Sequence, residues 1–376
     1  MHCSENAYAI TRMDHNGYVE PPVSTLEIYP AYIEKEVKQT VEQVQKLQGK
    51  NTFSFGFITD THYAINLKAT HQIRFRRTLN AYKEIAKRVH LDFLAMGGDH
   101  TNDGDKQYKC DCFRELRAEL DGVRYFPVNG NHDSNVLWDT DFVPAPLSTN
   151  HLTPEENYPL FYNHVPAQGG VFNRNDHGLY YYYDNRAANV RYIFLDTGDV
   201  PFVCDNGKLR YDPQHLYALS QAQIDWLTDE ALRLPEPNWT IVLFAHIAPI
   251  PRGEDIRHLE ICHDILKAYQ TGAVCTIEKG DGDFVQKVDV DFSSYNRGRI
   301  ACMMLGHSHV DYSAQQDGIR YIETGCSIMY TGASYSIPRK DGDKSELLFD
   351  IVTVDPMKRE IHLTRVGAAE DRYFSY

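Results

Sequence analysis

Five short apolar runs follow one another along the chain after residue 50, and each ends abruptly in polar residues. They are FSFGFITDTH from Phe53, LDFLAMGGDH from Leu91, RYFPVNGNHD from Arg124, TIVLFAHIAP from Thr240 and IACMMLGHSH from Ile300. Their length and mostly apolar content are typical of buried strands. We therefore predict five strands whose ends carry polar side chains.

Segments with helical spacing of apolar residues lie between and around these runs. They are HQIRFRRTLNAYKEIAKRVH, FRELRAEL, LSQAQIDWLTDEALRL and DIRHLEICHDILKAY. Alternation of strand and helix indicates βαβ units and a layered fold. Near the end of the chain, GIRYIETG, LLFDIVTVD and REIHLTRVG follow without helices. We predict an α/β fold, a four-layer αββα sandwich of two mixed β-sheets flanked by helices, with residues 311–376 supplying antiparallel strands of the second sheet.

An N-terminal arm precedes this body. In residues 1–50, YIEKEVKQTVEQVQKLQ predicts an amphipathic helix over residues 32–48. Its apolar face consists of Ile33, Val37, Val41, Val44 and Leu47. We expect this helix to pack on the main body; a contact in a homodimer is the alternative.

The remaining chain, residues 51–376, is predicted to form one domain with two insertions. Residues 134–178 are rich in Pro, Asn, His and aromatic residues, and residues 253–299 hold a helix and the polar segment EKGDGDFVQKVD. Long loops in compact domains are usually functional or disordered, so we interpret both insertions as walls or lids of a site. Between them, GLYYYYDNRAANVRYIF predicts a hairpin that turns at Asp184 and Asn185.

Composition and charge narrow the class of protein. The 376 residues are 42% hydrophobic and 24% charged, with a formal net charge of −14. Such a surface disfavours nucleic acid as a partner. The eight cysteines have no framework spacing, the N-terminus has no signal-peptide core, and no run of about 18 apolar residues occurs. We expect a cytoplasmic protein with reduced thiols and no membrane span.

The polar ends of the five runs carry side chains that bind metals. They are Asp60, His62, Asp99, Asn131, His132, His246, His307 and His309. Ligands of open α/β sheets bind beyond the carboxyl ends of the strands. Oxygen and imidazole donors without thiolate suit Mn, Fe, Zn, Ni or Co and argue against a closed structural zinc site. This number of donors exceeds the needs of one ion and favours two divalent ions that share a carboxylate.

The spacing of these residues resembles a known family. Its blocks are Asp60-x-His62, Gly98-Asp99, Gly130-Asn131-His132-Asp133, Ala245-His246 and Gly306-His307-Ser308-His309. In this order they are similar to the calcineurin-like metallophosphoesterase superfamily. The resemblance implies an αββα sandwich with a dinuclear metal centre that hydrolyses phosphoester bonds by in-line attack of a hydroxide between the ions.

The resemblance also implies a role for each residue. Asp60, His62 and His309 correspond to ligands of the first metal, and Asn131, His246 and His307 to ligands of the second. Asp99 corresponds to the carboxylate that bridges both ions. His132 corresponds to the catalytic residue that acts on the leaving group as a general acid or an electrostatic support.

Some positions depart from particular branches of the superfamily. Protein phosphatases have an aspartate where this chain has Asn102, with Asp103 next to it. Purple acid phosphatases have glycine at the position of His62 and tyrosine at that of Asn102. The chain therefore resembles the branch with Asp-x-His, which includes class III cyclic-nucleotide phosphodiesterases. His100 and Tyr63, which flank predicted ligands, are candidates for supporting or substrate contacts, as are Asn102 and Asp103.

From this we predict a hydrolase of phosphate esters, with a phosphodiester favoured and Mn favoured as the activating metal. A phosphomonoesterase or a nucleotide pyrophosphatase is the alternative within the enzyme class. The alternative outside it is an interaction scaffold with the same fold.

Overall fold

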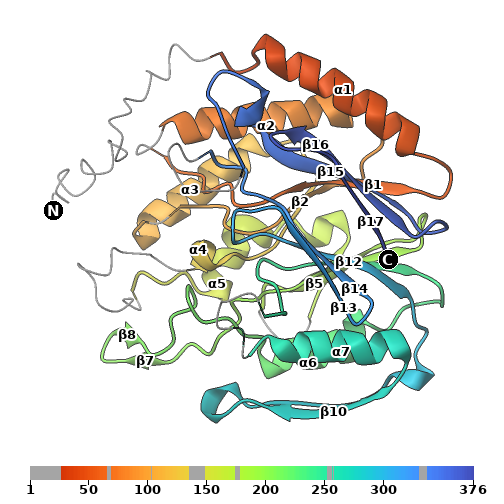
Figure 1. Cartoon of the computed structure of the whole chain (residues 1–376). Helices are drawn as coiled ribbons and strands as arrows, with labels where there is room; N and C mark the ends of the chain where they lie inside the picture. Colours follow the sequence, from red (N-terminus) through yellow and green to blue (C-terminus); the bar gives the residue numbers. More distant parts are fainter. Residues whose placement is uncertain are drawn as a thin grey trace.

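The computed structural model describes residues 27–65, 69–102, 104–134, 149–173, 178–251, 256, 258–329 and 337–376. Two large β-sheets lie between layers of helices in this part of the chain (Figure 1). Both sheets contain parallel and antiparallel pairs of strands. The predicted αββα sandwich of two mixed sheets is therefore confirmed.

The first sheet has six strands in the order β17-β16-β15-β1-β2-β3. Their bounds are Phe53–Ile58 (β1), Leu94–Met96 (β2), Tyr125–Pro127 (β3), Leu348–Asp355 (β15), Glu360–Gly367 (β16) and Arg372–Ser375 (β17). The strands β1, β2 and β3 run parallel, and β15 to β17 add antiparallel pairs beside β1. All six residues of β1 are buried, as expected for a central strand covered on both faces.

The second sheet has seven strands in the order β13-β14-β12-β9-β6-β5-β4. Their bounds are Gly170–Phe172 (β4), Tyr181–Asn185 (β5), Val190–Phe194 (β6), Thr240–Phe244 (β9), Arg299–Leu305 (β12), Tyr312–Gln316 (β13) and Ile319–Glu323 (β14). The central strands β6, β9, β12 and β14 are parallel, with antiparallel strands at both edges. The carboxyl ends of β9 and β12 thus lie side by side.

The prediction that residues 311–376 form strands of the second sheet is wrong for the later part. The strands β13 and β14 belong to the seven-stranded sheet, but β15 pairs antiparallel with β1, with Phe53 opposite Val354. The chain crosses from one sheet to the other between residues 324 and 347. The local sequence pattern of a strand does not indicate which sheet the strand joins, because the partner strand is about 300 residues away in the sequence.

Helices and short ribbons complete the described part. The helices are α1 (Ala31–Leu47), α2 (Ala69–Ala86), α3 (Lys106–Glu119), α4 (Asn131–Ser134), α5 (Pro154–Asn157), α6 (Gln221–Trp226) and α7 (Glu260–Thr271). Two antiparallel ribbons join β7 (Cys204–Asp205) to β8 (Lys208–Leu209) and β10 (Val274–Lys279) to β11 (Gln286–Asp291). Figure 1 shows α1, α2 and α3 over the six-stranded sheet and α6 and α7 below the seven-stranded sheet.

Aromatic side chains fill the space between the two sheets. Phe55 of β1 lies 5.3 Å from Phe244 of β9, between ring centroids. Phe93 lies 4.7 Å from Tyr192, and Phe194 lies 4.7 Å from Phe244. All five rings are buried. Edge and stacked contacts of this kind add to the gain from burial and hold the two sheets in one register.

The predicted helix of the N-terminal arm is present as α1 and packs on the body. Ile33, Val37 and Val44 are 0% exposed, and the helix contacts α2 and β16. Glu36 on the same face accepts a hydrogen bond from the backbone N–H of Gly367 at 2.9 Å. The apolar face is therefore used within the chain, which leaves the polar face for any contact with a second copy.

The hairpin of β5 and β6 forms as predicted, but its turn lies later. The strand β5 continues through Asn185, and the connection extends to Asn189, which has a φ of 53°. The Asn185 side-chain oxygen accepts hydrogen bonds from the N–H groups of Ala187 and Ala188 at 3.1 and 3.3 Å. Asparagine can close a turn from its first position in this way. The turn itself covers residues 186–189, so the sequence prediction placed it two residues too early.

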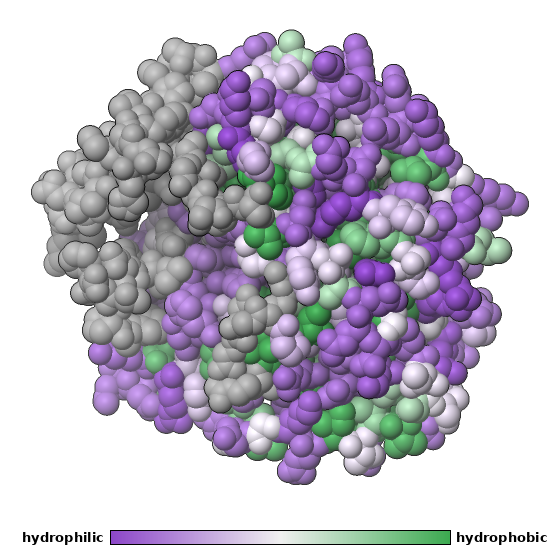
Figure 2. Space-filling view, viewed as in Figure 1, coloured by the Kyte–Doolittle hydropathy of each residue, from purple (hydrophilic) through white to green (hydrophobic). Residues whose placement is uncertain are grey.

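The surface of the described part is mainly polar. Figure 2 shows hydrophilic residues over most of the visible face, with hydrophobic residues in small separate groups among them. The large hydrophobic residues that are exposed in the described part come from distant segments, for example Phe202, Val274 and Met357. Scattered residues of this kind are normal on a surface and identify no binding face.

Candidate metal centre

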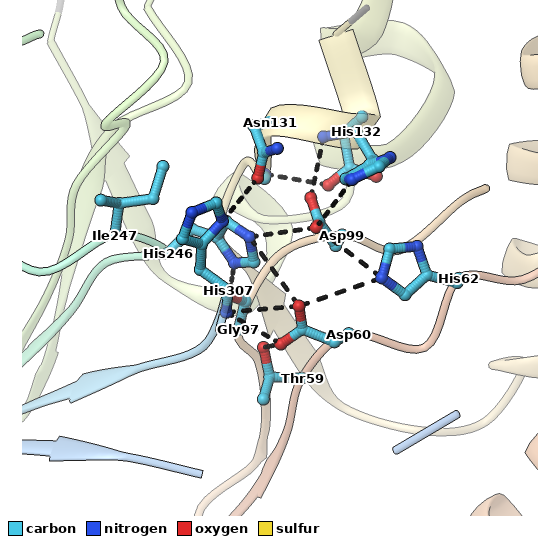
Figure 3. Close-up of polar contacts among 12 residues, drawn as sticks. Thr59, Asp60, His62, Gly97, Asp99, Asn131, His132, His246, Ile247 and His307 are labelled. Atoms are coloured by element: carbon cyan, nitrogen blue, oxygen red, sulfur yellow. Dashed lines mark hydrogen bonds and ion pairs between the residues drawn. The ribbon is translucent and has the colours of Figure 1, made fainter. Parts of the chain in front are cut away.

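The eight metal-type residues predicted from the sequence lie together at the carboxyl ends of five strands. Those on the first sheet follow β1, β2 and β3, and those on the second follow β9 and β12. Figure 3 shows Asp60, His62, Asp99, His246 and His307 pointing toward one another, with Asn131 and His132 at one side. The two sheets contribute to one site because their strand ends face the same edge of the sandwich.

The backbone at this site is unusual. Asp60, His62, Asp99, His307 and His309 all have positive φ angles, of 52°, 41°, 50°, 81° and 60°. Residues other than glycine rarely adopt this conformation, and each instance costs roughly 1–3 kcal/mol. Five of the seven predicted ligands thus have a strained backbone that the surrounding fold must hold. Strain concentrated in this way is typical of functional sites.

Two motif glycines are explained by close approach of the loops. A Cβ atom on Gly130 would lie 2.0 Å from the backbone nitrogen of Asp99. One on Gly306 would lie 2.1 Å from Oγ1 of Thr59. Larger residues would therefore separate the strand ends that carry the ligands.

The first group of candidate ligands contains Asp60, His62, Asp99 and His309, whose donor atoms all lie within 4.8 Å of one another. Nε2 of His309 lies 3.2 Å from Oδ1 of Asp60 and 3.1 Å from Nε2 of His62. Nε2 of His62 lies 3.8 Å from Oδ2 of Asp99. Two carboxylates and two imidazoles therefore surround one small space.

The second group contains Asp99, His246 and His307, again within 4.8 Å. Nε2 of His246 lies 3.2 Å from Oδ2 of Asp99. Nδ1 of His307 lies 3.0 Å from Oδ1 of Asn131, which brings the amide oxygen to this group. Asp99 belongs to both groups, so its carboxylate is shared between them.

The donor set fits a bound cation. Nδ1 of His246 donates a hydrogen bond to the carbonyl of Gly97 at 2.7 Å, which leaves Nε2 as the nitrogen with the lone pair. That Nε2 atom is buried without a hydrogen-bond partner and faces the carboxylates of Asp99 and Asp60. Lone pairs that face one another in a buried space repel unless a positive charge lies between them. The geometry thus calls for a proton or a metal ion at this point.

The pKa values of two histidines in this cluster show that the carboxylates favour positive charge beside them. Burial lowers the pKa of the His246 imidazole, but the carboxylates of Asp99 and Asp60 outweigh burial and raise it to about 9. Burial likewise lowers the pKa of His309, and the hydrogen bond to Asp60 outweighs it and raises the pKa to about 11. Protons on these two rings therefore balance the carboxylates when no metal is bound.

The other two imidazoles are neutral. Burial and the nearby His132 lower the pKa of His62 to about 3. Burial and the nearby His246 lower the pKa of His307 to about 4. Neutral rings are the form that binds metal, so these two are ready as ligands at neutral pH.

His132 lies at the open side of the cluster. Its side chain is 19% exposed, whereas that of His246 is 0% exposed. Its backbone N–H donates to Oδ1 of Asp99 at 2.8 Å, and the buried ammonium of Lys109 donates to its carbonyl. The loop is thus fixed while the ring can reach a bound molecule, which suits a role in acid–base chemistry and not in metal binding.

The structure gives the lesser candidates supporting positions. The ring of His100 is buried, with Nε2 2.8 Å from the carbonyl of Val128. Tyr63 is 0% exposed and packs edge-on against Phe75 at 5.5 Å. The backbone N–H of Asn102 donates to the carbonyl of Tyr63 at 3.2 Å. Asp103 lies outside the described residues.

Sequence reasoning missed three residues that hold the site together. Asp133, 0% exposed, accepts hydrogen bonds from the N–H groups of His100 and Gly130 at 2.8 and 2.9 Å. Glu323 accepts from the N–H and the hydroxyl of Ser308. Gln214 contacts both Asn131 and His132. Asp133 could have been found, because it belongs to the motif after β3; the other two carry no signal in the sequence.

The comparisons with known proteins identify the family. The family model for calcineurin-like phosphoesterases matches residues 53–311, and the chain belongs to this family. Members of the family use dinuclear divalent metal centres, and the family supports a phosphoesterase hydrolase. No curated protein matches the sequence significantly.

Three solved structures are similar to the chain. A dimetal phosphatase from Danio rerio is 16% identical, with a TM-score of 0.51, over 86% of this chain and 99% of that one. GAP50, the anchor in the inner membrane complex of Plasmodium, is 13% identical with a TM-score of 0.44, over 87% and 89%. The NAD nucleotidase of Haemophilus influenzae is 11% identical with a TM-score of 0.36, over 86% and 53%. At these identities the first shows a shared fold and nothing finer.

No described helix combines the length and the apolar character needed to cross a membrane.

Proposed function

We propose that the chain is a two-metal phosphoesterase that hydrolyses a small or medium phosphodiester. The observation that carries the proposal is the position of Asp99, whose carboxylate belongs to two adjacent groups of buried donors. In this proposal Asp60, His62 and His309 complete one metal site, and Asn131, His246 and His307 complete the other. Bound ions would lower the pKa of a shared water and neutralise charge on the phosphoryl oxygens.

The residues of the chain supply the rest of the chemistry. His132 would donate a proton or positive charge to the departing oxygen from the open side of the cluster. The buried ligands exclude water from the inner side and so strengthen the electrostatic effect of any charge in the site. The hydrogen bond from its backbone N–H to Asp99 keeps His132 beside the metals without making it a ligand.

The choice of a phosphodiester rests on the resemblance to the Asp-x-His branch. A histidine at position 62 is shared with the class III cyclic-nucleotide phosphodiesterases, and purple acid phosphatases lack it. Manganese is our choice of activating metal, because a site of carboxylates and imidazoles suits the first-row transition metals. A site without thiolate and without tyrosine among its ligands should also lack the purple colour of the tyrosine-ligated branch.

We also propose that the protein works in the cytoplasm on a small molecule and not on nucleic acid. The described cysteines are free, and burial raises the pKa of the Cys262 and Cys302 thiols to about 12. Free buried thiols are usual in reducing compartments. The net charge of −14 repels a nucleic-acid backbone.

A substrate panel tests the proposal. The metal-free protein and the protein loaded with Mn, Co, Ni, Zn or Ca are assayed on p-nitrophenyl phosphate, bis-p-nitrophenyl phosphate, cyclic nucleotides and nucleoside diphosphate conjugates. We expect hydrolysis only with transition metals and most rapidly on a diester, and none after chelation. Faster hydrolysis of p-nitrophenyl phosphate would indicate a phosphomonoesterase instead. Faster hydrolysis of the nucleoside diphosphate conjugates would indicate a nucleotide pyrophosphatase. Activity restored by Ca alone, or no activity on any ester, would overturn the proposal.

A further inference from the structure

Gln214 contacts both residues that follow β3. It lies between β8 and α6, about 80 positions along the chain from Asn131 and His132, and the residue is 1% exposed. Its backbone carbonyl accepts a hydrogen bond from Nδ2 of Asn131 at 3.3 Å. Its side-chain amide nitrogen lies 3.3 Å from Nδ1 and 3.5 Å from Nε2 of His132. One residue thus contacts a proposed metal ligand and the proposed leaving-group histidine.

The backbone of Gln214 is fixed by its neighbours. Its N–H donates to the side chain of Asp212 at 3.0 Å, which closes a turn. Its carbonyl also accepts from the hydroxyl of Tyr217 at 2.8 Å. Tyr217 is 4% exposed, so both contacts are held in a packed environment.

The fixed carbonyl determines which way Asn131 points. A carbonyl oxygen only accepts hydrogen bonds, so Asn131 must turn its NH₂ group toward Gln214. The amide oxygen then faces the other way, where it lies 3.0 Å from Nδ1 of His307. Gln214 therefore presents Asn131 to the metal centre as an oxygen donor.

The side chain of Gln214 acts on His132 in a separate way. Its Oε1 atom is buried without a hydrogen-bond partner, while Nε2 faces the imidazole. Nε2 is nearly equidistant from both ring nitrogens, so the amide lies over the face of the imidazole and not in line with either lone pair. An amide N–H that points at the ring face is a weak favourable contact, and the buried amide limits the directions in which the ring can point.

Gln214 is not the only side chain beside this ring. Nε2 of His132 also lies 3.9 Å from Oδ2 of Asp99. Asp99 belongs to both groups of candidate metal ligands, whereas Gln214 reaches the ring from the segment between β8 and α6.

We propose that Gln214 is a positioning residue that aligns the His132 imidazole with the leaving group of the substrate. This inference rests on the proposed phosphoesterase activity. General acid–base help is worth about 10²–10⁴-fold, and poorer alignment of the ring should remove part of it, about 10–100-fold. The effect should be confined to substrates whose leaving group needs protonation, because only those depend on His132.

The variant Gln214→Met tests the inference. Methionine keeps the volume of the side chain and the backbone carbonyl that orients Asn131, and removes only the amide. We expect two metal ions per chain as in the wild type, and kcat lowered about 10–100-fold for a diester with an alkyl leaving group. The rate for bis-p-nitrophenyl phosphate should change little, since p-nitrophenolate leaves without a proton. Gln214→Glu, which keeps an acceptor at the ring, should recover part of the rate on the alkyl ester.

Gln223→Met provides the matched control. Gln223 is 0% exposed and exchanges two hydrogen bonds of 2.9 Å with the backbone of Asp196, without a described contact to His132. Its replacement should lower the thermal midpoint and leave the ratio of the two rates unchanged. Equal losses on both esters, or loss of metal from Gln214→Met or Gln214→Glu, would overturn the positioning role. A wild-type protein inactive on every ester would instead overturn the proposed function.

Discussion

The two halves of the proposed metal centre are held in different ways. The first half has its own carboxylate, since Asp60 lies 3.2 Å from His309, and both residues belong to the motifs after β1 and β12. The second half has a neutral amide and two imidazoles in addition to Asp99. Its residues are oriented by groups outside the motifs, such as the carbonyl of Gln214.

This difference concerns charge as well as support. The first half would keep the carboxylate of Asp60 if Asp99 were lost, whereas the second half would keep only this same carboxylate at a greater distance, 4.0 Å from Nε2 of His246. A dication needs negative charge to offset the loss of its hydration. The second half therefore depends more strongly on the shared carboxylate, and changes to the site should affect the two halves unequally.

Replacing the shared carboxylate should have the largest effect. In Asp99→Asn we expect the metal content to fall from two ions to less than one per chain, with the remaining ion held weakly beside Asp60. Charge stabilisation by the metals is worth several kcal/mol, so activity should fall by on the order of 10³-fold or more at about 1.4 kcal/mol for each factor of ten. Elemental analysis and kinetics measure both changes.

The control for this variant is Asp92→Asn. Asp92 is a buried aspartate, 8% exposed, that accepts a hydrogen bond from Tyr192 at 2.7 Å. Its replacement should leave two ions bound. If Asp99→Asn retained both ions, the bridging role of Asp99 would be wrong.

Removing the leaving-group histidine should have the next largest effect and should spare both halves of the centre. In His132→Ala we expect metal content near that of the wild type and kcat lowered by about 10²–10⁴-fold on an ester with a poor leaving group. The loss should be smaller on p-nitrophenyl esters. Metal analysis and parallel kinetics on the two esters check this, and an equal loss on both esters would contradict the role of His132.

Metal binding should depend on pH through the two protonated rings. The pKa values of His246 and His309 are raised to about 9 and about 11 in the metal-free protein, so both rings carry protons at pH 7. Metal must displace these protons, and affinity should therefore fall as the pH is lowered, by about tenfold per pH unit for each proton released. Above pH 9 His246 is already neutral and the slope should halve.

Calorimetry in buffers of different ionisation enthalpy measures the protons released. We expect about two protons at pH 7 when both sites fill, one from each half of the centre. Release from one half only would show that the halves differ in protonation as well as in support. Binding that released no protons would contradict the balance of charge described here.

Weakening the loop that joins the two halves should have the smallest effect. Glu323, 2% exposed, accepts from the N–H of Ser308 at 3.1 Å, and Ser308 lies between His307 and His309. In Glu323→Ala we expect metal affinity to fall by about 10–100-fold at both sites, because one loop serves both. Metal titration measures the affinity of each site. As the control, Glu360→Ala, on a strand that carries none of the proposed ligands, should leave the affinity unchanged. If Glu323→Ala lost affinity at one site only, the two histidines would be held independently.

The sequence by itself determined the strand ends and the metal-type side chains that follow them. The apolar runs before Asp60, Asp99 and His246 each form the predicted strand, and the glycines beside the ligands occur where loops approach within contact distance. These features are local: a few neighbouring residues decide whether a segment is buried and extended, and the residue after it then lies at the edge of the sheet. The family resemblance rests on the same local blocks.

The tertiary structure alone decided which distant segments complete the site. The choice of sheet for β15, the contact of Gln214 with His132 and that of Glu323 with Ser308 join residues 15 to about 300 positions apart. A buried glutamine or glutamate looks the same in the sequence whether it supports a ligand or packs elsewhere. Its partner is set only when hydrophobic burial has brought the two sheets together, because the hydrogen bond itself is too short-ranged and too weak to select it beforehand.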